Sequence, residues 1–127
     1  MDVKSAFLND ELFEKIYVKQ PPSFVQTGYE DEVCLLKRAL YGLKQAPRAW
    51  YHKIHMFFNN CGFYCSHADS NLYVLYVEDA IAVLIVLYVD DLIITGSRTR
   101  LIDEVTVQLS TQFEMTVLHY YLGMEIR

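Results

Sequence analysis

The strongest pattern in the chain is a long apolar stretch that two acidic residues interrupt. Residues 81–89 and 92–95 consist almost entirely of β-branched and other apolar side chains, and the pair Asp90-Asp91 stands between them. Runs of this length and composition are typical of buried strands. Another apolar run at 72–77 ends at the short turn sequence 78–80. We therefore predict three consecutive antiparallel strands, with the two aspartates at the tip between the second and the third.

Two further segments place apolar residues at helical spacing. In the first, Pro47 suits the opening turn of a helix and Gly62 suits its left-handed end. In the second, polar residues separate an apolar stripe that recurs at every fourth position. The apolar faces consist of Trp50, Ile54, Phe57, Phe58 and Cys61 in the first segment and of Leu101, Val105 and Leu109 in the second. These patterns predict helices at about 48–61 and 98–112, both packed on one face of a sheet.

Shorter strand signals flank these elements. Residues 16–18 and 32–37 predict an antiparallel pair with a long connection that contains Gly28, and the prolines after residue 20 end the first strand. Residues 117–126, around Gly123, predict a closing strand or a hairpin arm. The whole pattern predicts an α+β fold, in which an antiparallel sheet carries two main helices on one face.

Composition narrows the classes of protein that fit. At 127 residues the chain forms one domain at most, and its 53% hydrophobic content is too high for a disordered tail. The formal net charge of −5 has the wrong sign for a domain that grips nucleic acid by itself, which argues against a free-standing polymerase or DNA binder. No apolar run reaches the ~20 residues of a membrane helix and no secretory leader opens the chain, so we expect an intracellular protein without membrane contact.

The pair Asp90-Asp91 has two interpretations. Aspartate is common in β-turns, so the pair can simply form the tip of a hairpin, and the tetrapeptide alone favours this interpretation. Alternatively, the pair binds divalent metal, because hard cations such as Mg²⁺ prefer oxygen ligands and are held by one or two carboxylates plus substrate phosphates. The metal interpretation needs another acid from a neighbouring strand.

Four stretches of the sequence, taken together, favour the metal interpretation over the simple hairpin turn. They are MDVKSAFLN (Met1–Asn9), LYGLKQAPRAWY (Leu40–Tyr51), YVDDLIITG (Tyr88–Gly96) and YLGMEI (Tyr121–Ile126). In this order they resemble the palm of a reverse transcriptase, specifically of the copia-type branch of LTR retrotransposons. A single Tyr-x-Asp-Asp is weak by itself, but the similarity covers essentially the whole chain. The expected activity is therefore that of an RNA-directed DNA polymerase encoded in a retrotransposon Pol polyprotein.

The resemblance implies a role for each acid. Asp2 and Asp90 would be shared ligands of two Mg²⁺ ions, Mn²⁺ being an acceptable substitute, and Asp91 would be a third catalytic acid. The Val3 carbonyl, beside the nucleotide, would be available as a backbone ligand. These ions would serve nucleotidyl transfer to the 3′ hydroxyl of a primer. This reaction depends on positioning of the substrates and on charge stabilisation more than on a protein nucleophile.

The resemblance also implies binding residues for nucleotide, template and primer. Phe7 matches the family position whose ring crowds the sugar 2′ carbon and so favours deoxynucleotides. Leu122 and Gly123 match the hairpin that supports the primer end. The residues expected beside the incoming nucleotide and the template are Gly42, Lys44 and Gln45.

By this resemblance, residues 1–127 are a partial reverse transcriptase domain: a palm with incomplete fingers and without thumb or RNase H. The implied partners are an RNA template, a DNA primer, deoxynucleoside triphosphates and the remaining Pol regions (fingers, thumb, RNase H and integrase). The implied location is intracellular, in a cytoplasmic virus-like particle if the chain is part of an intact element. Two alternatives stay open, a catalytically inactive retrotransposon remnant and a small metal-binding or interaction module.

Overall fold

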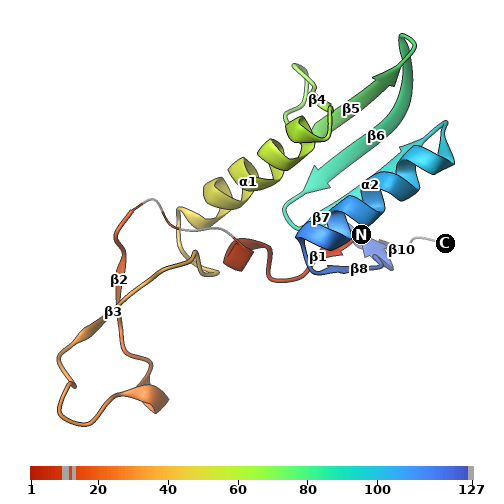
Figure 1. Ribbon diagram of the computed structural model, residues 1–127. Coiled ribbons are helices and arrows are strands. Elements are labelled where there is room, and N and C mark those ends of the chain that lie inside the picture. The colour runs from red at the N-terminus through yellow and green to blue at the C-terminus, as the bar shows by residue number, and fades with distance from the viewer. Residues whose placement is uncertain (10–11, 13, 126–127) are drawn as a thin grey trace.

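The computed structural model describes residues 1–9, 12 and 14–125, and its centre is a six-stranded sheet (Figure 1). All neighbouring strands of this sheet are antiparallel. In their order across the sheet, the strands are β4 (Tyr64–Cys65), β5 (Leu72–Val77), β6 (Ala80–Tyr88), β7 (Asp91–Gly96), β1 (Asp2–Val3) and β8 (Met115–Thr116). The predicted α+β fold with an antiparallel sheet is confirmed.

The three predicted central strands form one meander, β5-β6-β7. The turn between β5 and β6 consists of Glu78 and Asp79, which both have positive φ, 53° and 61°. Two such residues in succession are the hairpin turn whose twist matches that of the flanking strands. Along β6, Val83, Ile85 and Leu87 are buried whereas the residues between them are half-buried. The strand therefore presents one face to the core, although its sequence is apolar on both faces.

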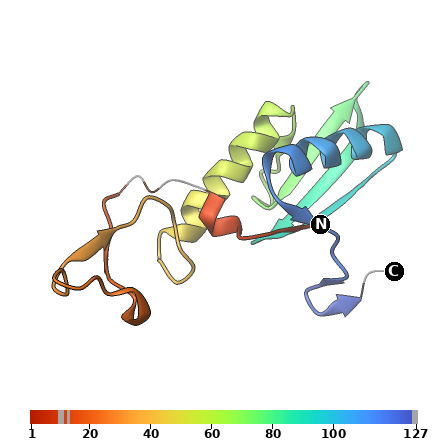
Figure 2. The same ribbon diagram turned by 60° about the horizontal axis from the view of Figure 1, so that its bottom comes forward.

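Both helices lie on one face of the sheet, as predicted (Figure 2). Helix α1 spans Ala46–Asn60 and α2 spans Thr99–Gln112. The first helix begins two residues earlier than predicted because Pro47 occupies its first turn, where a missing N–H costs nothing. At the other end Gly62 has φ +85° and reverses the chain, as the sequence predicts.

The hydrophobic core fills the space between this sheet face and the two helices. Its largest fully buried side chains include Trp50, Phe58, Tyr73, Ile85 and Leu92. Phe58 of α1 contacts Tyr73 of β5, with ring centroids 4.6 Å apart. Burying a side chain of this size contributes about 1.5–3 kcal/mol relative to exposure. The core therefore fixes α1 firmly against the meander that carries the two aspartates.

Three strands of the sheet were not predicted. β1, β4 and β8 have two residues each, too few for any alternation of apolar and polar side chains to show in the sequence. β1 and β8 extend the sheet beyond β7, with Asp2 paired to Asp91 on one side and to Thr116 on the other. As a result the first residues of the chain lie inside the sheet and not at its edge.

Two smaller two-stranded sheets lie outside the central sheet. Their strands are β2 (Tyr17–Lys19) with β3 (Val33–Leu35), and β9 (Tyr120–Tyr121) with β10 (Met124–Glu125). The first pair, with the short 3-10 helix η2 (Pro22–Phe24), forms an arm that extends away from the sheet (Figure 1). Both pairs confirm predicted strands, although Ile126, the last residue of the predicted hairpin arm, lies outside the described residues. Among the residues that the structure describes, no helix is long and apolar enough to cross a membrane.

Candidate functional site

The two aspartates differ in their backbone setting. Tyr88 pairs with Asp91, so the turn between β6 and β7 consists of Val89 and Asp90 alone, and Asp91 already belongs to β7. Val89 has φ +56°, a left-handed conformation that is rare for a β-branched residue and costs of order 1–3 kcal/mol. The indole Nε1 of Trp50 donates a hydrogen bond to the Val89 carbonyl oxygen at 2.6 Å. Helix α1 thus holds the turn in its strained conformation.

The remaining predicted acid, Asp2, lies beside this turn. Asp2 stands directly opposite Asp91, and the Val3 amide donates to the Asp90 carbonyl oxygen at 2.9 Å. Directly paired residues of antiparallel strands direct their side chains to the same face. The next residue along each strand, Val3 and Leu92, is buried in the core. Asp2 and Asp91 therefore share the face that lies opposite the helices.

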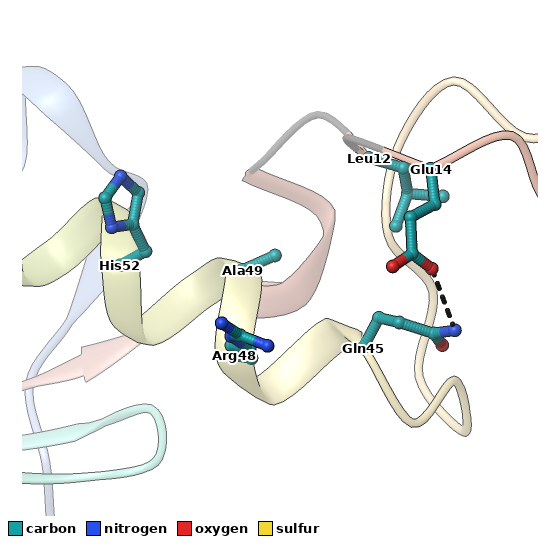
Figure 3. Close-up of a pocket in the computed structure, with 6 residues that line it drawn as sticks. All are labelled: Leu12, Glu14, Gln45, Arg48, Ala49 and His52. Atoms are coloured by element: carbon teal, nitrogen blue, oxygen red, sulfur yellow. Dashed lines mark hydrogen bonds between the residues drawn. The ribbon is translucent and has the colours of Figure 1, made fainter.

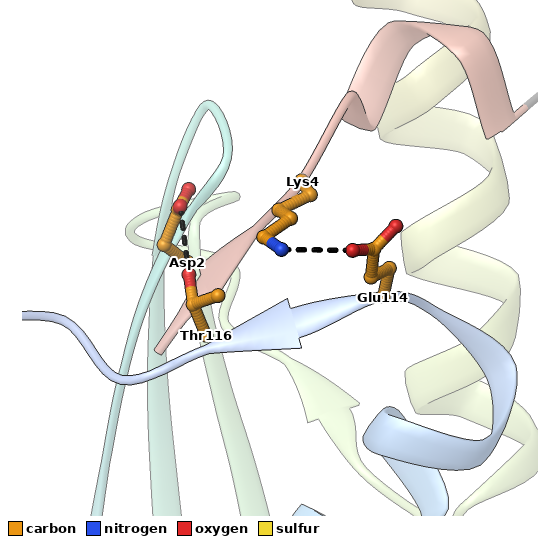
Figure 4. Close-up of polar contacts among 4 residues, drawn as sticks. All are labelled: Asp2, Lys4, Glu114 and Thr116. Atoms are coloured by element: carbon orange, nitrogen blue, oxygen red, sulfur yellow. Dashed lines mark hydrogen bonds and ion pairs between the residues drawn. The ribbon is translucent and has the colours of Figure 1, made fainter.

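Asp2 is oriented by a residue that the prediction did not include. Thr116 of β8 pairs with Asp2, and its Oγ1 donates a hydrogen bond to Asp2 Oδ2 at 3.0 Å (Figure 4). Nothing in the sequence marks Thr116, because a lone threonine in a two-residue strand has no pattern around it. Trp50, by contrast, is part of the second stretch of the resemblance, but its bond to the turn follows only from the structure.

The electrostatics of this face favour a cation. Burial raises the pKa of the Asp91 carboxyl above its usual value, and the neighbouring charges of Asp90 and then Asp2 raise it further. Lys4 follows closely in the chain, but its Nζ forms an ion pair with Glu114 at 2.8 Å (Figure 4). The pKa of Lys4 is raised mainly by Glu114 and to a smaller extent by the charge of Asp2, so this lysine offsets the repulsion among the carboxylates only in part.

These acids fit a divalent metal that is shared with a substrate. Within residues 1–9, 12 and 14–125, no three His, Cys, Asp or Glu side chains form a ready metal cage. Mg²⁺ does not require one, because it keeps several waters and binds through one or two carboxylates plus substrate phosphates. Carboxylate oxygens that repel one another on an open sheet face are the donor chemistry that such an ion prefers.

The second stretch meets the first through an aromatic contact. Phe7 lies in a short 3-10 helix, η1 (Ala6–Asn9), and its ring centroid is 4.6 Å from that of Tyr41. Gly42 follows with φ +90°, a conformation that favours glycine. Lys44 and Gln45 come next and are exposed at the start of α1. Helix η1 follows β1 in the chain. The contact between Phe7 and Tyr41 therefore brings Phe7 close to the segment that contains Gly42, Lys44 and Gln45, at the start of α1.

The fourth stretch reaches the turn from the other side. Leu122 and Gly123 have φ of 49° and 80° and form the tip of the β9-β10 hairpin. Tyr121 is buried, and its ring meets that of Tyr88 edge-on with centroids 6.5 Å apart. Burial raises the pKa of the Tyr121 hydroxyl, and the charge of Asp91 raises it further. All four stretches thus converge around the β6-β7 turn, as far as their described residues show.

Comparisons with known proteins agree with this convergence. A family model described as "Reverse transcriptase (RNA-dependent DNA polymerase)" matches residues 1–127. The chain is 43% identical over 130 residues to the "Retrovirus-related Pol polyprotein from transposon RE2" of Arabidopsis thaliana, a match that covers 100% of this chain and 9% of the relative. It is 41% identical over 130 residues to the corresponding RE1 polyprotein of the same plant, again with 100% and 9% coverage.

A third relative has the same kind of description. The chain is 39% identical over 129 residues to the "Retrovirus-related Pol polyprotein from transposon TNT 1-94" of Nicotiana tabacum, which covers 99% of this chain and 10% of the relative. The chain therefore spans about a tenth of the length of these polyproteins. No solved structure matches it significantly.

Proposed function

We propose, from the premise that the chain belongs to the reverse transcriptase (RNA-dependent DNA polymerase) family, that it is the palm region of an RNA-directed DNA polymerase of a copia-type element. In this proposal it extends a DNA primer with deoxynucleotides by two-metal nucleotidyl transfer. One observation carries the proposal: Asp2 and Asp91 are paired on one open sheet face, and Asp90 lies in the turn beside them.

Asp2, Asp90 and Asp91 would hold the divalent metal, Mg²⁺ or Mn²⁺. When bound, such metal supplies a lowered pKa for the primer 3′ hydroxyl and charge stabilisation for the leaving pyrophosphate. The chain's own contribution is to fix the carboxylates before substrate arrives. Thr116 orients Asp2 by its hydrogen bond, and Trp50 holds the turn that carries Asp90. Preorganised charge of this kind needs no rearrangement during the reaction.

The proposal also assigns binding roles to residues of the first, second and fourth stretches. Phe7 would form the wall against the sugar 2′ position, and Leu122 and Gly123 would support the primer end. The residues proposed to lie beside the incoming nucleotide and the template are Val3, Gly42, Lys44 and Gln45. The exposed Leu122 and the exposed start of α1 leave both regions open to a ligand.

The proposal extends to the rest of the polyprotein, of which the chain would be one part. The partners would be an RNA template, a DNA primer, deoxynucleoside triphosphates and the finger, thumb, RNase H and integrase regions. The cytoplasmic virus-like particle of an intact element is the corresponding location.

Primer extension on an RNA template tests this function. We expect product from a chimaera in which this chain replaces the matching segment of the RE2 polyprotein, in the presence of Mg²⁺. The 127-residue chain alone should give no detectable product, because it corresponds to only about a tenth of the length of the polyproteins that it matches. A folded chimaera that makes no product would contradict the proposal, and processive synthesis by the isolated chain would show that the other regions matter less than we propose.

Phe7 offers a test of the substrate site within this function. In the chimaera, Phe7→Ala should raise the efficiency of ribonucleotide incorporation relative to deoxynucleotide incorporation, because removing the ring opens space for a 2′ hydroxyl. If Phe7 serves only in packing against Tyr41, the substitution costs stability, at most about 3–5 kcal/mol for a buried Phe, and affects both nucleotides equally. The measurement is the ratio of the two efficiencies in the soluble fraction.

A matched control for this test is Phe63→Ala. Phe63 is a buried core aromatic after the end of α1, so its loss should lower stability and leave the nucleotide ratio unchanged. An unchanged ratio in both variants would remove Phe7 from the substrate site.

A further inference from the structure

The charge of the chain is unevenly distributed. Residues 15–53 contain seven Lys and Arg residues and three acidic residues, a formal charge of +4, although the whole chain has −5. The remaining residues therefore have −9. A net charge calculated over the whole chain conceals a cationic region, which includes the β2-β3 arm and the first half of α1.

One face of the arm combines cations with an aromatic ring. Lys15, Tyr17 and Lys19 alternate with less exposed residues, so they lie on the same face of the ribbon. Tyr17 is 58% exposed and pairs with Leu35 of β3. The Leu36 amide donates to the Ile16 carbonyl oxygen at 2.9 Å. This bond continues the register past β3 and places the exposed Lys37 on the same face, next to Lys15.

These lysines are not neutralised within the described part of the chain. The ion pairs found there join Lys4 to Glu114, Arg98 to Glu78 and Arg100 to Glu104, and none includes a cation of the arm. Glu30 lies toward the tip of the arm, where its carboxylate accepts a hydrogen bond from the Gly28 amide at 2.9 Å, and Glu14 lies at the base, where it accepts a hydrogen bond from Gln45. Among the described residues, the lysines of the cationic face therefore have no ion-pair partner.

The base of the arm joins the start of α1. Gln45 Nε2 donates a hydrogen bond to Glu14 Oε2 at 3.3 Å, at the edge of a cavity of about 400 Å³ (Figure 3). The cavity is lined by Leu12, Glu14, Gln45, Arg48, Ala49 and His52. Arg48 lies on the helix side of this cavity (Figure 3). The positive charge thus continues from the arm to the helix end that carries the proposed template residues.

We propose that the face formed by Lys15, Tyr17, Lys19 and Lys37 binds a single strand of nucleic acid, the lysines contacting phosphates and Tyr17 stacking on a base. Surfaces that bind single strands combine cations with stacking aromatics in this way. A protein partner is less well matched, because the cores of protein interfaces are depleted in Lys. That the bound strand is the RNA template rests on the proposed function.

Fluorescence anisotropy of a labelled 12-nucleotide oligouridylate, titrated with this chain at low salt, tests the proposal. The double variant Lys15→Gln/Lys19→Gln should bind about tenfold more weakly, and the salt dependence, log Kd against log salt, should lose a slope of about 1.4, or 0.7 for each phosphate contact. The matched control is Arg98→Gln/Arg100→Gln, which removes the same charge from the start of α2. Equal losses in both double variants would mean general electrostatic attraction and would overturn the proposal.

Tyr17→Ala tests the stacking contact separately from charge. We expect about tenfold weaker binding of the same oligonucleotide, within the range found for bases stacked on aromatic side chains. Tyr76→Ala, at a similarly exposed tyrosine of β5, should leave binding unchanged. If Tyr17→Ala keeps its affinity for RNA and instead abolishes self-association in sedimentation, the face is a protein interface and the proposal is wrong.

This outcome is independent of the polymerase assignment. Binding by the arm is measured without metal or synthesis, whereas the function is measured by primer extension in the chimaera. Product from a chimaera whose arm variants bind RNA normally would refute only the arm, and RNA binding by the arm without any product would refute only the polymerase.

Discussion

Asp90→Asn should lower primer extension by the RE2 chimaera by several powers of ten while RNA binding stays nearly unchanged. The two side chains have the same shape, so the substitution removes the negative charge and leaves the turn in place. Each 1.4 kcal/mol of lost transition-state stabilisation lowers the rate about tenfold, and a ligand shared between two ions is expected to supply several such increments. The readouts are the single-turnover rate of extension and the Kd for template.

The stability of the variant separates this explanation from misfolding. Asp90 raises the pKa of Asp91 by repulsion, so removing its charge should leave the free energy of unfolding at neutral pH unchanged or slightly higher. Asp79→Asn is the matched control, because Asp79 lies in the other hairpin turn of β6 and should have no effect on synthesis. A rate for Asp90→Asn near that of the parent chimaera would leave the metal assignment without support.

Gly96→Ala is the substitution that should damage the fold most. An added Cβ at Gly96 would lie 2.1 Å from the Ala82 carbonyl oxygen and 2.9 Å from the Val83 Cα, both backbone atoms of the neighbouring strand β6. Strand β6 is paired on both sides, with β5 and with β7, so its backbone cannot move aside without breaking a ladder of hydrogen bonds. We expect a loss of about 3 kcal/mol, the upper end of the usual cost of overpacking, measured as a lower urea midpoint for this chain.

A neighbouring position provides the control for this clash. Thr95 precedes Gly96 in β7 and is exposed, so Thr95→Ala should change the free energy of unfolding by no more than about 0.5 kcal/mol. Equal midpoints for Gly96→Ala and the unsubstituted chain would mean that β6 and β7 lie farther apart at Gly96 than the structure has them.

The sequence predicted the elements whose patterns are long enough to read. The meander and both helices have apolar periodicities that extend over many residues, and Pro47 and Gly62 mark the ends of α1 by chemistry that only these residue types supply. β1, β4 and β8 were missed because a two-residue strand is defined by its partners and not by its own side chains. Asp2 therefore could not be placed in the sheet by pattern, only by resemblance.

The candidate site likewise combines residues that were predicted with contacts that only the structure shows. The three acids were predicted from the resemblance, and the structure places them side by side, although their catalytic roles stay predictions. The contacts of Thr116 and Trp50 with the acids' surroundings were missed, because each is a tertiary hydrogen bond between segments far apart in sequence. The net charge of −5 argued against a free-standing polymerase or DNA binder, but a sum over the chain contains no information on where the cations lie.

The position of β1 between β7 and β8 has a consequence for synthesis of the protein in the cell. From β4 to β7, each strand pairs with the next strand in the sequence, so this part of the sheet forms from local contacts, which are fast to make. Asp2 must instead wait for residues 91 and 116 before its two strand partners exist. The ribosome releases the amino-terminal end first. The cluster of Asp2, Asp90 and Asp91 is therefore the last part of the sheet to assemble during synthesis. A polypeptide that ends before β8 has the meander and α1 but no Thr116 to orient Asp2.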